Sequence, residues 1–406
     1  MSGVSFMEKL LDGVAVDWKS LGDERFFEIA NSGRKPVKAS LREPGVTPYY
    51  GANNIQDYVE GHTHDGEFVL IAEDGSVSLE NYSIQYAIGK FWANNHVHVV
   101  RGTQVVNTRF MYHYLSVVNF IPFLTGGGRA KLTKGSMVEI QIPIPCPDNS
   151  KKSLEIQAEI VRILDAFTEL TTELTTELTA RKKQYNHYRE QLLSFEDGDV
   201  EWKTLGDVTK KWYSGGTPTA GVPKYYEGGD IPWLRTQEVK FSDIHSTEVK
   251  ITEAAVKNSA AKWIPVNCVI IAISGATAGR SAINRIPMTT NQHCGCLEID
   301  DSKALYRYVF HWVSFNYENI KSLGQGARGD LNSSIIKSFK LPIPYPDDPE
   351  KSLAEQARIV TILDKFDALT NSITEGLPRE IELRQKQYAH YRDFLLSFPK
   401  SEKVEV

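Results

Sequence analysis

Cysteine is scarce in this 406-residue chain, and four copies are too few for a disulfide framework. We therefore expect free thiols at Cys146, Cys268, Cys294 and Cys296. Long apolar runs are missing too, since no run approaches the roughly 20 residues of a membrane-spanning helix. Met1 to Asp12 lacks the basic start and apolar core of a signal peptide. These absences predict a cytoplasmic protein with no membrane partner.

The chain also lacks an excess of positive charge. Its net charge of -5 argues against a protein that coats nucleic acid nonspecifically by counterion release. Sequence-specific DNA binding stays open if positive charge is local to one face, or if partner subunits supply part of it. The length exceeds what one hydrophobic core supports and fits two domains with connecting elements.

A duplication dominates what is present. Asp17-Trp-Lys-Ser-Leu-Gly-Asp23 recurs as Glu201-Trp-Lys-Thr-Leu-Gly-Asp207, and Ile142-Pro-Ile-Pro145 recurs 199 residues later as Leu341-Pro-Ile-Pro344. Lys183-Gln-Tyr185 matches Lys386-Gln-Tyr388 at an offset of 203, so four residues have entered the second copy between these anchors. The start of the chain resembles the exit of the first repeat, which makes the unit almost circular and predicts that both termini lie near one spot.

The two copies are unequally alike. From the Pro-Ile-Pro segment onward the match is close to residue for residue, whereas only short islands match upstream. This inequality predicts two identical partners for the shared segments and two different targets for the divergent ones.

Each shared segment has the apolar spacing of a long helix. In the first copy apolar residues recur at steps of three, four or seven from Ile160 to Leu192, and in the second from Ile359 to Leu395 with one extra step of four. Each stripe is narrow, so the other helix is the expected partner, in an antiparallel coiled coil. Gly376-Leu-Pro378 conflicts with this interpretation because proline kinks or breaks a helix. We expect the proline-rich segments before the helices to stop any strand.

The globular segments, roughly 14–145 and 198–344, combine β-rich runs with one helical stretch near each end. Phe68 to Ala72 and Cys268 to Ser274 are the clearest strand candidates, and about 107–120 and 303–321 are the helical ones. The fold class is therefore α+β, and the strand order is not readable.

Three Thr-Glu-Leu-Thr tetrapeptides fill residues 168–179, in the middle of the first helix. They could be no more than a helix surface with leucine on the packing face. The four-residue offset between the copies favours a length function instead, because one tetrapeptide lengthens a helix by about 6 Å. Residues 153–195, if wholly helical, would span about 64 Å, on the order of two turns of B-DNA. The repeat therefore predicts that this helix acts as a ruler, because its length sets the distance between the two recognition surfaces.

Two recurring motifs are candidates for DNA contact. The glycine-rich stretches 126–131 and 324–329 carry interleaved Arg and Lys, and glycine lets backbone approach a phosphate or base edge closely. A flexible loop is the alternative. Asn94-Asn-His-Val-His98 aligns with Thr290-Asn-Gln-His293, and amides can pair bidentately with adenine, although turn-capping amides are at least as common.

No catalytic constellation is found. Ser274 to Ser281 resembles a phosphate-binding loop but is one residue short and has Arg280 where lysine is needed. His293-Cys-Gly-Cys296 lacks a second ligand pair, so buried thiols are the better interpretation. Asp347 and Glu350 favour helix capping over nuclease chemistry.

These residues resemble the specificity subunit (HsdS) of type I restriction-modification systems, in particular the type IC branch. The specific elements are the two Lys-Gln-Tyr helix ends, the run from Thr374 to Leu383 and the central tetrapeptide repeat; Pro48-Tyr-Tyr-Gly-Ala-Asn53 and Gly215-Gly-Thr-Pro218 support them as openings of target recognition domains. The repeat unit here is Thr-Glu-Leu-Thr where relatives carry Thr-Ala-Glu-Leu. Gly376-Leu-Pro378 belongs to the family pattern.

The resemblance implies two target recognition domains, residues 1–147 and 198–346, related by pseudo-twofold symmetry and separated by two long antiparallel helices, residues 148–197 and 347–400. It also implies that each domain reads one half of a bipartite site in double-stranded DNA. Two methyltransferase (HsdM) subunits would dock on the helices and restriction-translocase (HsdR) subunits would join them. S-adenosylmethionine, ATP and Mg2+ would be used on those partners and not on this chain, which would be no enzyme on its own.

We expect the DNA contacts and the spacer positions at specific residues. The DNA candidates are Asn94, Asn95, His96, Arg129, Lys131, Lys134, Arg235, Asn291, Gln292 and Arg328; the spacer candidates are Leu170, Leu174, Leu178, Leu369, Ile373 and Leu377. One alternative is a coiled-coil scaffold without sequence-specific DNA binding. The other is a stand-alone nuclease or methyltransferase, which would need a site that the sequence does not offer.

Overall fold

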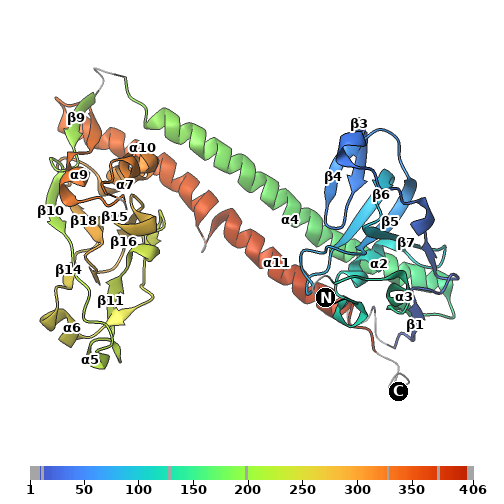
Figure 1. Cartoon of the computed structure of the whole chain (residues 1–406). Helices are drawn as coiled ribbons and strands as arrows, with labels where there is room; N and C mark the ends of the chain where they lie inside the picture. The colour runs from blue at the N-terminus through green and yellow to red at the C-terminus, as the bar shows by residue number, and fades with distance from the viewer. Residues whose placement is uncertain are drawn as a thin grey trace. The chain divides into compact units, whose positions relative to one another are not determined.

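The computed structural model describes residues 10, 13–126, 130–196, 200–326, 329–372 and 375–399. The chain divides into two compact units, Met1–Glu173 with Ile381–Val406, and Leu174–Glu380. This division falls inside the long helices α4 (Ser150–Leu192) and α11 (Gly376–Leu395), which are labelled in Figure 1. Each unit therefore contains one globular domain and part of the helical segments. The candidate residues Arg129, Arg328 and Ile373 lie outside the described residues.

Unit 1 is built on a six-stranded sheet whose central strand is buried on both faces. Along β5, Phe68 and Leu70 join one apolar cluster while Val69 and Ile71 join another on the opposite face. Strand alternation explains this split, and it explains why the run from Phe68 to Ala72 is continuously apolar. The strands, in sheet order, are β2 (Phe27–Ile29), β7 (Val97–Gly102), β5 (His64–Ala72), β6 (Ile84–Ala93), β3 (Pro44–Tyr50) and β4 (Ile55–Val59).

The helical stretch expected in unit 1 is α2 (Thr108–Leu115), which lies beside the sheet (Figure 1). Its Met111 and Leu115 side chains pack in the same apolar cluster as Val69. Asn107 begins this helix, because its side chain accepts hydrogen bonds from the backbone N–H groups of Arg109 and Phe110. A short helix, α3 (Lys134–Met137), follows with Thr133 as its cap. The predicted helix over 107–120 is confirmed with a shorter extent.

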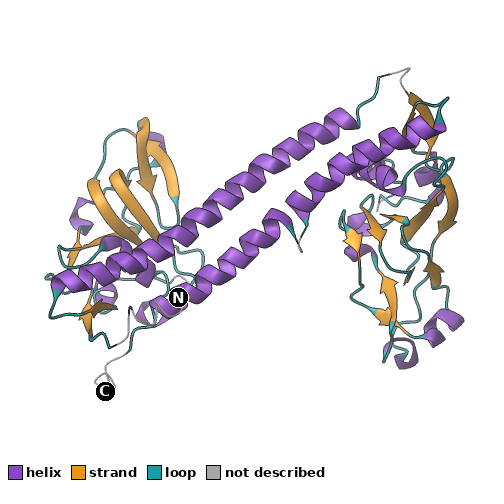
Figure 2. Cartoon of the chain, turned by 180° about the vertical axis from the view of Figure 1, so that it is seen from behind, coloured by secondary structure: helices purple, strands orange, loops and turns teal. Residues whose placement is uncertain are grey.

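Unit 2 has a counterpart of each strand in this sheet, but one counterpart is divided, and the strands β12 (Asp243–Ile244) and β14 (Lys262–Ile264) are additional. The strand equivalent to β6 is divided into β16 (Ser281–Asn284) and β17 (Met288–Thr290), and Pro287 lies between them. Two sheets result, one ordered β10 (Thr209–Tyr213), β18 (Cys294–Ile299), β15 (Val269–Ala272), β16 and β12 (Asp243–Ile244), the other β13 (Lys250–Ile251), β11 (Ile231–Leu234), β17 and β14 (Lys262–Ile264). The helices are α5 (Pro223–Tyr226), α6 (Glu253–Asn258), α7 (Tyr306–Phe315), α8 (Tyr317–Ser322) and α9 (Ser333–Ser338). Figure 2 distinguishes the helices from the strands by colour.

Three of the four thiols are core residues of unit 2. Cys268, Cys294 and Cys296 pack in one apolar cluster with Ile270 and Leu234, and burial raises the pKa of Cys268 and of Cys294 to about 12. Cys146 is half-buried, and all four are free cysteines. The buried-thiol interpretation of the Cys-Gly-Cys segment is confirmed.

The expectation that the proline-rich segments stop any strand is wrong. Each forms the second strand of a two-stranded antiparallel ribbon, β1 (Val16–Ser20) with β8 (Gln141–Pro145) and β9 (Val200–Thr204) with β19 (Lys340–Pro344). Prolines two residues apart face the same edge of a strand, and in a two-stranded ribbon that edge needs no partner strand. The Pro342 carbonyl accepts from the Tyr308 hydroxyl at 2.9 Å.

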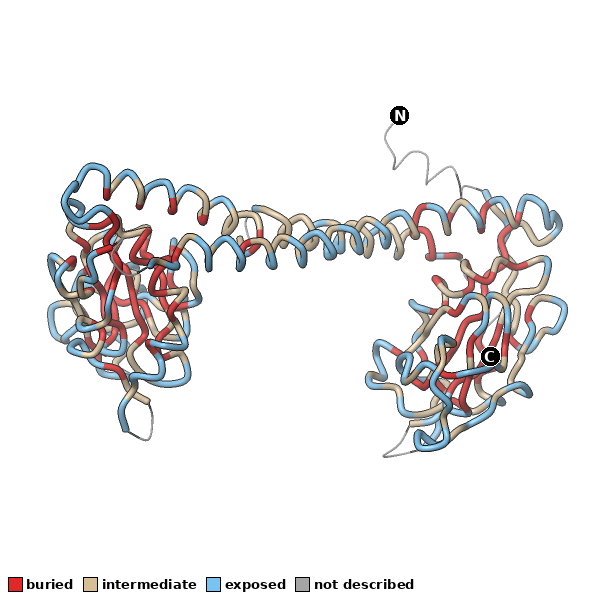
Figure 3. The backbone as a smooth tube through the Cα atoms, turned by 90° about the horizontal axis from the view of Figure 1, so that it is seen from above, coloured by how far each residue is buried: buried red, intermediate tan, exposed pale blue. Residues whose placement is uncertain are grey.

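The helices pack in antiparallel pairs within each unit. In unit 1, Phe167 of α4 stacks on Tyr391 of α11, with ring centroids 5.3 Å apart. In unit 2, Tyr188 of α4 stacks on Phe366 of α10 (Pro349–Asn371) at 5.4 Å. The spacer candidates Leu170, Leu174 and Leu178 lie on a half-buried stripe of α4, as their spacing predicts. Buried positions concentrate in the globular domains, whereas most of each helix is half-buried or exposed (Figure 3).

The second helical segment, whose continuity Gly376-Leu-Pro378 left open, consists of two helices. α10 ends at Asn371 and α11 begins at Gly376, whose φ is +77°, a conformation that favours glycine. Pro378 lies in the first turn of α11, where its missing N–H costs little. Leu369 and Leu377 therefore belong to different helices, and both are half-buried.

The two ends of the described chain meet in unit 1, as the circular repeat predicts. The Trp18 indole donates to the Pro399 carbonyl at 3.0 Å, and Leu10 and Val14 pack with Leu395.

Among the helices that the structure describes, none combines the length and the apolar composition that a membrane-spanning helix needs.

Candidate nucleic-acid interface

Two buried asparagines hold the turns in which the candidate contact residues lie. The Asn94 side-chain oxygen accepts the backbone N–H of His96 at 2.8 Å, and Asn291 accepts that of His293 at 3.0 Å. Asn94 is 3% exposed and Asn291 is 7% exposed, so these amides shape their turns from within. The next two side chains, Asn95 and His96 or Gln292 and His293, are exposed.

Two neighbouring loops bond to each turn. In unit 1 the N–H of Glu73 donates to the carbonyl of His96, and the N–H of Leu132 donates to the carbonyl of Glu73. In unit 2 Ile273, His293 and Leu331 make the same two bonds, at 2.9 and 2.7 Å. We call residues 73–75, 94–96, 125–126 and 130–132 the first loop cluster, and residues 273–275, 291–293, 325–326 and 329–331 the second. The two candidate motifs of the sequence thus come together in each unit.

The first loop cluster exposes an amide, an imidazole and an amine. His96 is held by Asp74, whose carboxylate lies 2.5 Å from the imidazole Nδ1. The Lys131 amine lies 3.0 Å from the carboxylate of Glu73, and the guanidinium of Arg34 lies 2.6 Å from the other oxygen of that carboxylate. The cations of this cluster are therefore paired with acids, so its surface is polar and not strongly basic.

The second loop cluster has the same backbone hydrogen bonds but exposes different side chains. The Nδ1 of His293 lies 2.6 Å from the Ser274 hydroxyl, where His96 has a carboxylate. The side chain of Gln292 accepts from the Thr217 hydroxyl at 2.8 Å. Arg235 follows β11 beside this turn, because the N–H of Asn291 donates to the carbonyl of Leu234. Its guanidinium pairs with Glu248 at 2.7 Å.

His98 anchors the first loop cluster from below. Its Nε2 lies 2.8 Å from the Leu132 carbonyl and its Nδ1 lies 2.9 Å from the Asn31 amide, which fits the neutral ring with Nε2–H as donor. Burial lowers the pKa of His98, although the Leu132 carbonyl and Glu73 oppose the shift. Burial also raises the pKa of Glu73, but hydrogen bonds from Arg34 and Lys131 outweigh it and hold that pKa below its ordinary value.

Acidification is expected to destabilise the globular domain of unit 1. Burial lowers the folded-state pKa of His98 and of His113 below 6.5, so the unfolded chain binds these protons first. Their contribution is complete above pH 6.5 and declines as the pH falls below it. We expect a lower urea midpoint at about pH 5.5 than at pH 7.5, with a smaller difference in His98→Gln. An equal pH dependence in the variant would show that His98 is not responsible.

A second set of polar residues attaches each domain to its helix, and sequence reasoning missed it. Asp165 of α4 lies 2.9 Å from Arg109 and 2.8 Å from His113, both on α2. Asp364 of α10 makes the same contacts with Arg307 (2.5 Å) and His311 (2.6 Å) of α7. The signal was present in the duplication, because Arg-x-x-x-His recurs at an offset of 198 among otherwise divergent residues, and the aspartate recurs at an offset of 199.

The pKa of Asp364 reflects this attachment. Burial of the carboxyl would raise its pKa, but hydrogen bonds from His311 and Arg307 outweigh burial and lower it. The neutral His113 ring is more than 98% buried, and its Nδ1 has no hydrogen-bond partner. These residues position the domain on the helix and are distant from the exposed turns in sequence.

The predicted site residues are therefore only partly brought together. Asn95, His96 and Lys131 share the first loop cluster, and Gln292 lies in the second with Arg235 beside it. Asn94 and Asn291 form the turns. Lys134 is exposed at the first position of α3, two residues beyond the first cluster. His293, which is not among the predicted contact residues, is exposed at the position equivalent to His96, and its place in the Asn-Gln-His motif is the sequence signal for it.

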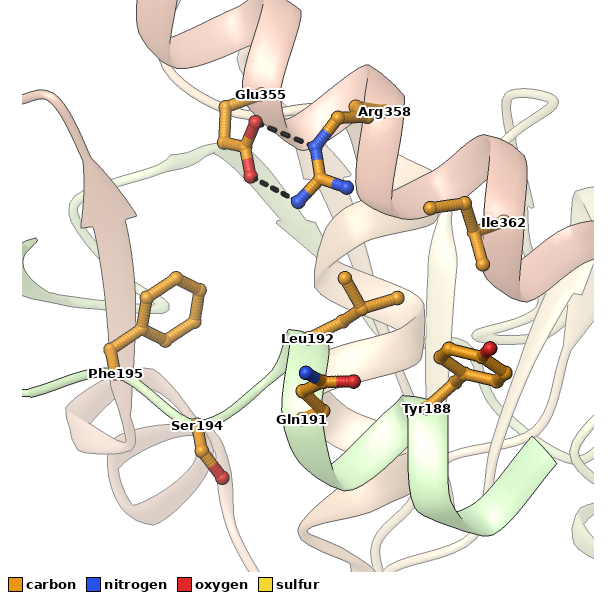
Figure 4. Close-up of a pocket in the computed structure, with 8 residues that line it drawn as sticks. All are labelled: Tyr188, Gln191, Leu192, Ser194, Phe195, Glu355, Arg358 and Ile362. Carbon is orange, nitrogen blue, oxygen red and sulfur yellow. Dashed lines mark hydrogen bonds and ion pairs between the residues drawn. The ribbon is translucent and has the colours of Figure 1, made fainter. Parts of the chain in front are cut away.

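One groove in unit 2 is lined by residues outside the second loop cluster. It has a volume of about 460 Å³ and is formed where α4 ends against α10. Figure 4 shows Leu192 and Ile362 facing each other across it and Glu355 paired with Arg358 on its wall. In unit 1 the equivalents of Glu355 and Phe195 are Ile156 and Phe398, which pack in an apolar cluster.

The described residues of the three catalytic candidates do not form a metal site or a phosphate-binding loop. Among the described residues no group of three or more His, Cys, Asp or Glu side chains could hold a metal ion. The segment resembling a phosphate loop leads from η5 (Gly275–Thr277) into β16 and not into a helix. Asp348, next to Asp347, caps α10 by accepting the N–H of Lys351.

Comparison with known proteins gives the family. The model for the type I restriction modification DNA specificity domain matches residues 15–182 and 198–383. A type I restriction enzyme specificity subunit of Haemophilus influenzae is 46% identical over 97% of this chain and 98% of its own length. The EcoR124I/EcoR124II specificity subunit of Escherichia coli is 39% identical over the whole of both chains.

A solved structure shares the fold. The crystal structure of the S subunit of a type I restriction-modification system from M. genitalium superposes with a TM-score of 0.66, covering 96% of this chain and 98% of the other at 14% identity. The mixed α+β domains with long helices are thus a known arrangement. Together with the two matches to the family model, these likenesses show that the chain belongs to the type I restriction-modification specificity subunits.

Proposed function

We propose that this chain is the DNA-recognition subunit of a type I restriction-modification complex, and that each loop cluster reads one half of a bipartite site. The family model matches once in each repeat, so each globular domain corresponds to one recognition module. The chain itself contributes recognition, and the chemistry belongs to partner subunits.

This proposal rests on the observation that the two loop clusters share one hydrogen-bonding pattern but expose different side chains. Both clusters use a buried asparagine and the same two backbone hydrogen bonds to fix the turn. The exposed groups differ, with Asn95, His96 and Lys131 in one and Gln292 and His293 in the other. Amide, imidazole and ammonium groups all hydrogen-bond to base edges in the major groove. Different groups on equal frames fit two different half-sites.

The helices would serve partners and spacing. Their near-identity in the two copies fits two identical methyltransferase subunits, one on each repeat. We further propose that these partners methylate adenine with S-adenosylmethionine, and that restriction-translocase subunits act with ATP and Mg2+. Because the chain carries a net charge of -5, and because the cations of the first cluster are paired with acids, the partners would supply part of the phosphate contacts.

The length of α4 would set the gap between the half-sites. A continuous helix of 43 residues is about 64 Å long at 1.5 Å per residue. Its middle consists of the tetrapeptide repeat, which changes length in steps of one helical turn without moving leucine off the packing stripe.

Competition binding tests recognition against the scaffold alternative. The chain is assembled with its methyltransferase partner and bound to a labelled duplex that carries its site, then challenged with unlabelled duplexes. Sequence recognition predicts that a specific duplex competes at least about 10³-fold better than an unrelated one. Equal competition would favour a coiled-coil scaffold without sequence-specific binding.

A further inference from the structure

The two helical arms have the same helical length although their chain lengths differ. α4 has 43 residues, and α10 and α11 have 23 and 20, which together also make 43. The four residues that the second copy has gained separate the end of α10 at Asn371 from the start of α11 at Gly376. The second arm therefore has four more residues than α4, whereas its two helices together have the same number of residues as α4.

The aromatic contacts show independently that the second arm has four additional residues. Phe167 with Tyr391 and Phe366 with Tyr188 are the same contact in the two copies, at 5.3 and 5.4 Å. Subtracting residue numbers gives 21 steps from Phe167 to Tyr188 along α4, but 25 from Phe366 to Tyr391 along the second arm. Four residues of the second arm are thus in excess of what the pairing needs.

The backbone at Gly376 shows how the chain rejoins. A Cβ built at Gly376 would lie 2.3 Å from the carbonyl oxygen of Ala368 and 2.8 Å from that of Leu369, both in the last turn of α10. In an unbroken helix the Ala368 carbonyl would receive the N–H of residue 372. Gly376 therefore lies against the end of α10 where the next helical residue would lie, and its lack of a side chain makes that approach possible.

We propose that the four residues from Ser372 to Glu375 are a compensating insertion that leaves the helical pairing unchanged, so that α4 alone determines the gap between half-sites. This inference rests on the proposed function. α4 is continuous and cannot shorten without losing helical turns, whereas the second arm has four residues between Asn371 and Gly376 that the aromatic pairing does not need. Length changes in α4 would be absorbed at that junction, and the reverse would not hold.

A straightened second arm tests the proposal. Ser372 to Glu375 are deleted, and Gly376→Glu with Pro378→Thr gives the arm the residues of Glu173 and Thr175 in α4. Methylation mapping of a host with this variant and its partner should show the half-sites and gap of the unmodified chain. A gap changed by one or two base pairs, with half-sites intact, would overturn the proposal. No bipartite site with the unmodified chain would instead contradict the proposed function.

Thermal unfolding of the full chain gives a readout that needs no DNA. Gly376→Ala should lower the midpoint by more than about 2 °C, since it adds both an unfavourable φ and a clash with the Ala368 carbonyl. Gly228→Ala is the matched control, because Gly228 has φ +66° but nothing within 4 Å of its Cβ. If Gly376→Ala matched the control or raised the midpoint, the close approach would be absent and the proposal wrong.

Discussion

Deleting Thr172 to Thr175 is expected to leave both half-sites intact and to shorten the gap between them by one or two base pairs. The deletion removes one tetrapeptide, about 6 Å of helix, against 3.4 Å per base pair. The packing stripe survives because Leu170 and Leu178 become four residues apart. Methylation at the original site should fall to background, since a two-part site with the wrong gap offers only one half at a time. Methylation-sensitive sequencing measures both effects.

The matched control for this deletion keeps the length. Thr172→Ala removes a hydroxyl that donates to the Thr168 carbonyl on an exposed face of α4, without moving any residue along the helix. Its gap should equal that of the unmodified chain. Altered half-site sequences in the deletion variant would contradict the ruler, because the loop clusters lie outside the deleted segment.

Replacing Asn95 and His96 with alanine should abolish discrimination at one half-site only. A good bidentate base contact contributes about 1–3 kcal/mol, so the loss of affinity for the intact site should be roughly 5- to 150-fold. Asn94 still holds the turn, so the frame should remain. Binding is measured with the assembled complex and three duplexes, one intact and one altered in each half-site.

The reciprocal variant serves as control. Gln292→Ala with His293→Ala changes the same turn positions in unit 2 and should affect only the other half-site. If either double variant weakened discrimination at both half-sites equally, the assignment of one cluster to one half-site would fail.

Secondary structure and duplication were predictable because they depend on local periodicity. The stripe through Leu170 and Leu174, the run from Phe68 to Ala72 and the helix near Tyr112 all follow from spacing, and the structure contains each. The prolines of Ile142 to Pro145 led to the wrong prediction that no strand forms there. A strand with one partner tolerates proline, and local sequence does not encode whether a strand has one partner or two.

The site was predictable in part for the same reason. Both candidate motifs lie in the loop clusters, but the bonds that join them, such as Leu132 to Glu73, connect residues about 60 apart in the sequence. The distinction between Asn94, which shapes the turn, and Asn95, which is exposed, depends on burial. The break before Gly376 was visible as Gly-Leu-Pro, yet the apolar spacing across it favoured a continuous helix.

An exchange of domains tests the division of labour most directly. The β1–β8 and β9–β19 ribbons close each domain with the same register, Val16 opposite Pro145 and Val200 opposite Pro344. Replacing residues 200–344 by residues 16–145 therefore joins equivalent ends, and Arg109 and His113 of the incoming α2 can meet Asp364 as they meet Asp165. The methylation map of the exchanged chain with its partner is the decisive measurement. We predict two copies of the first half-site on opposite strands across an unchanged gap. An unchanged second half-site would contradict the account.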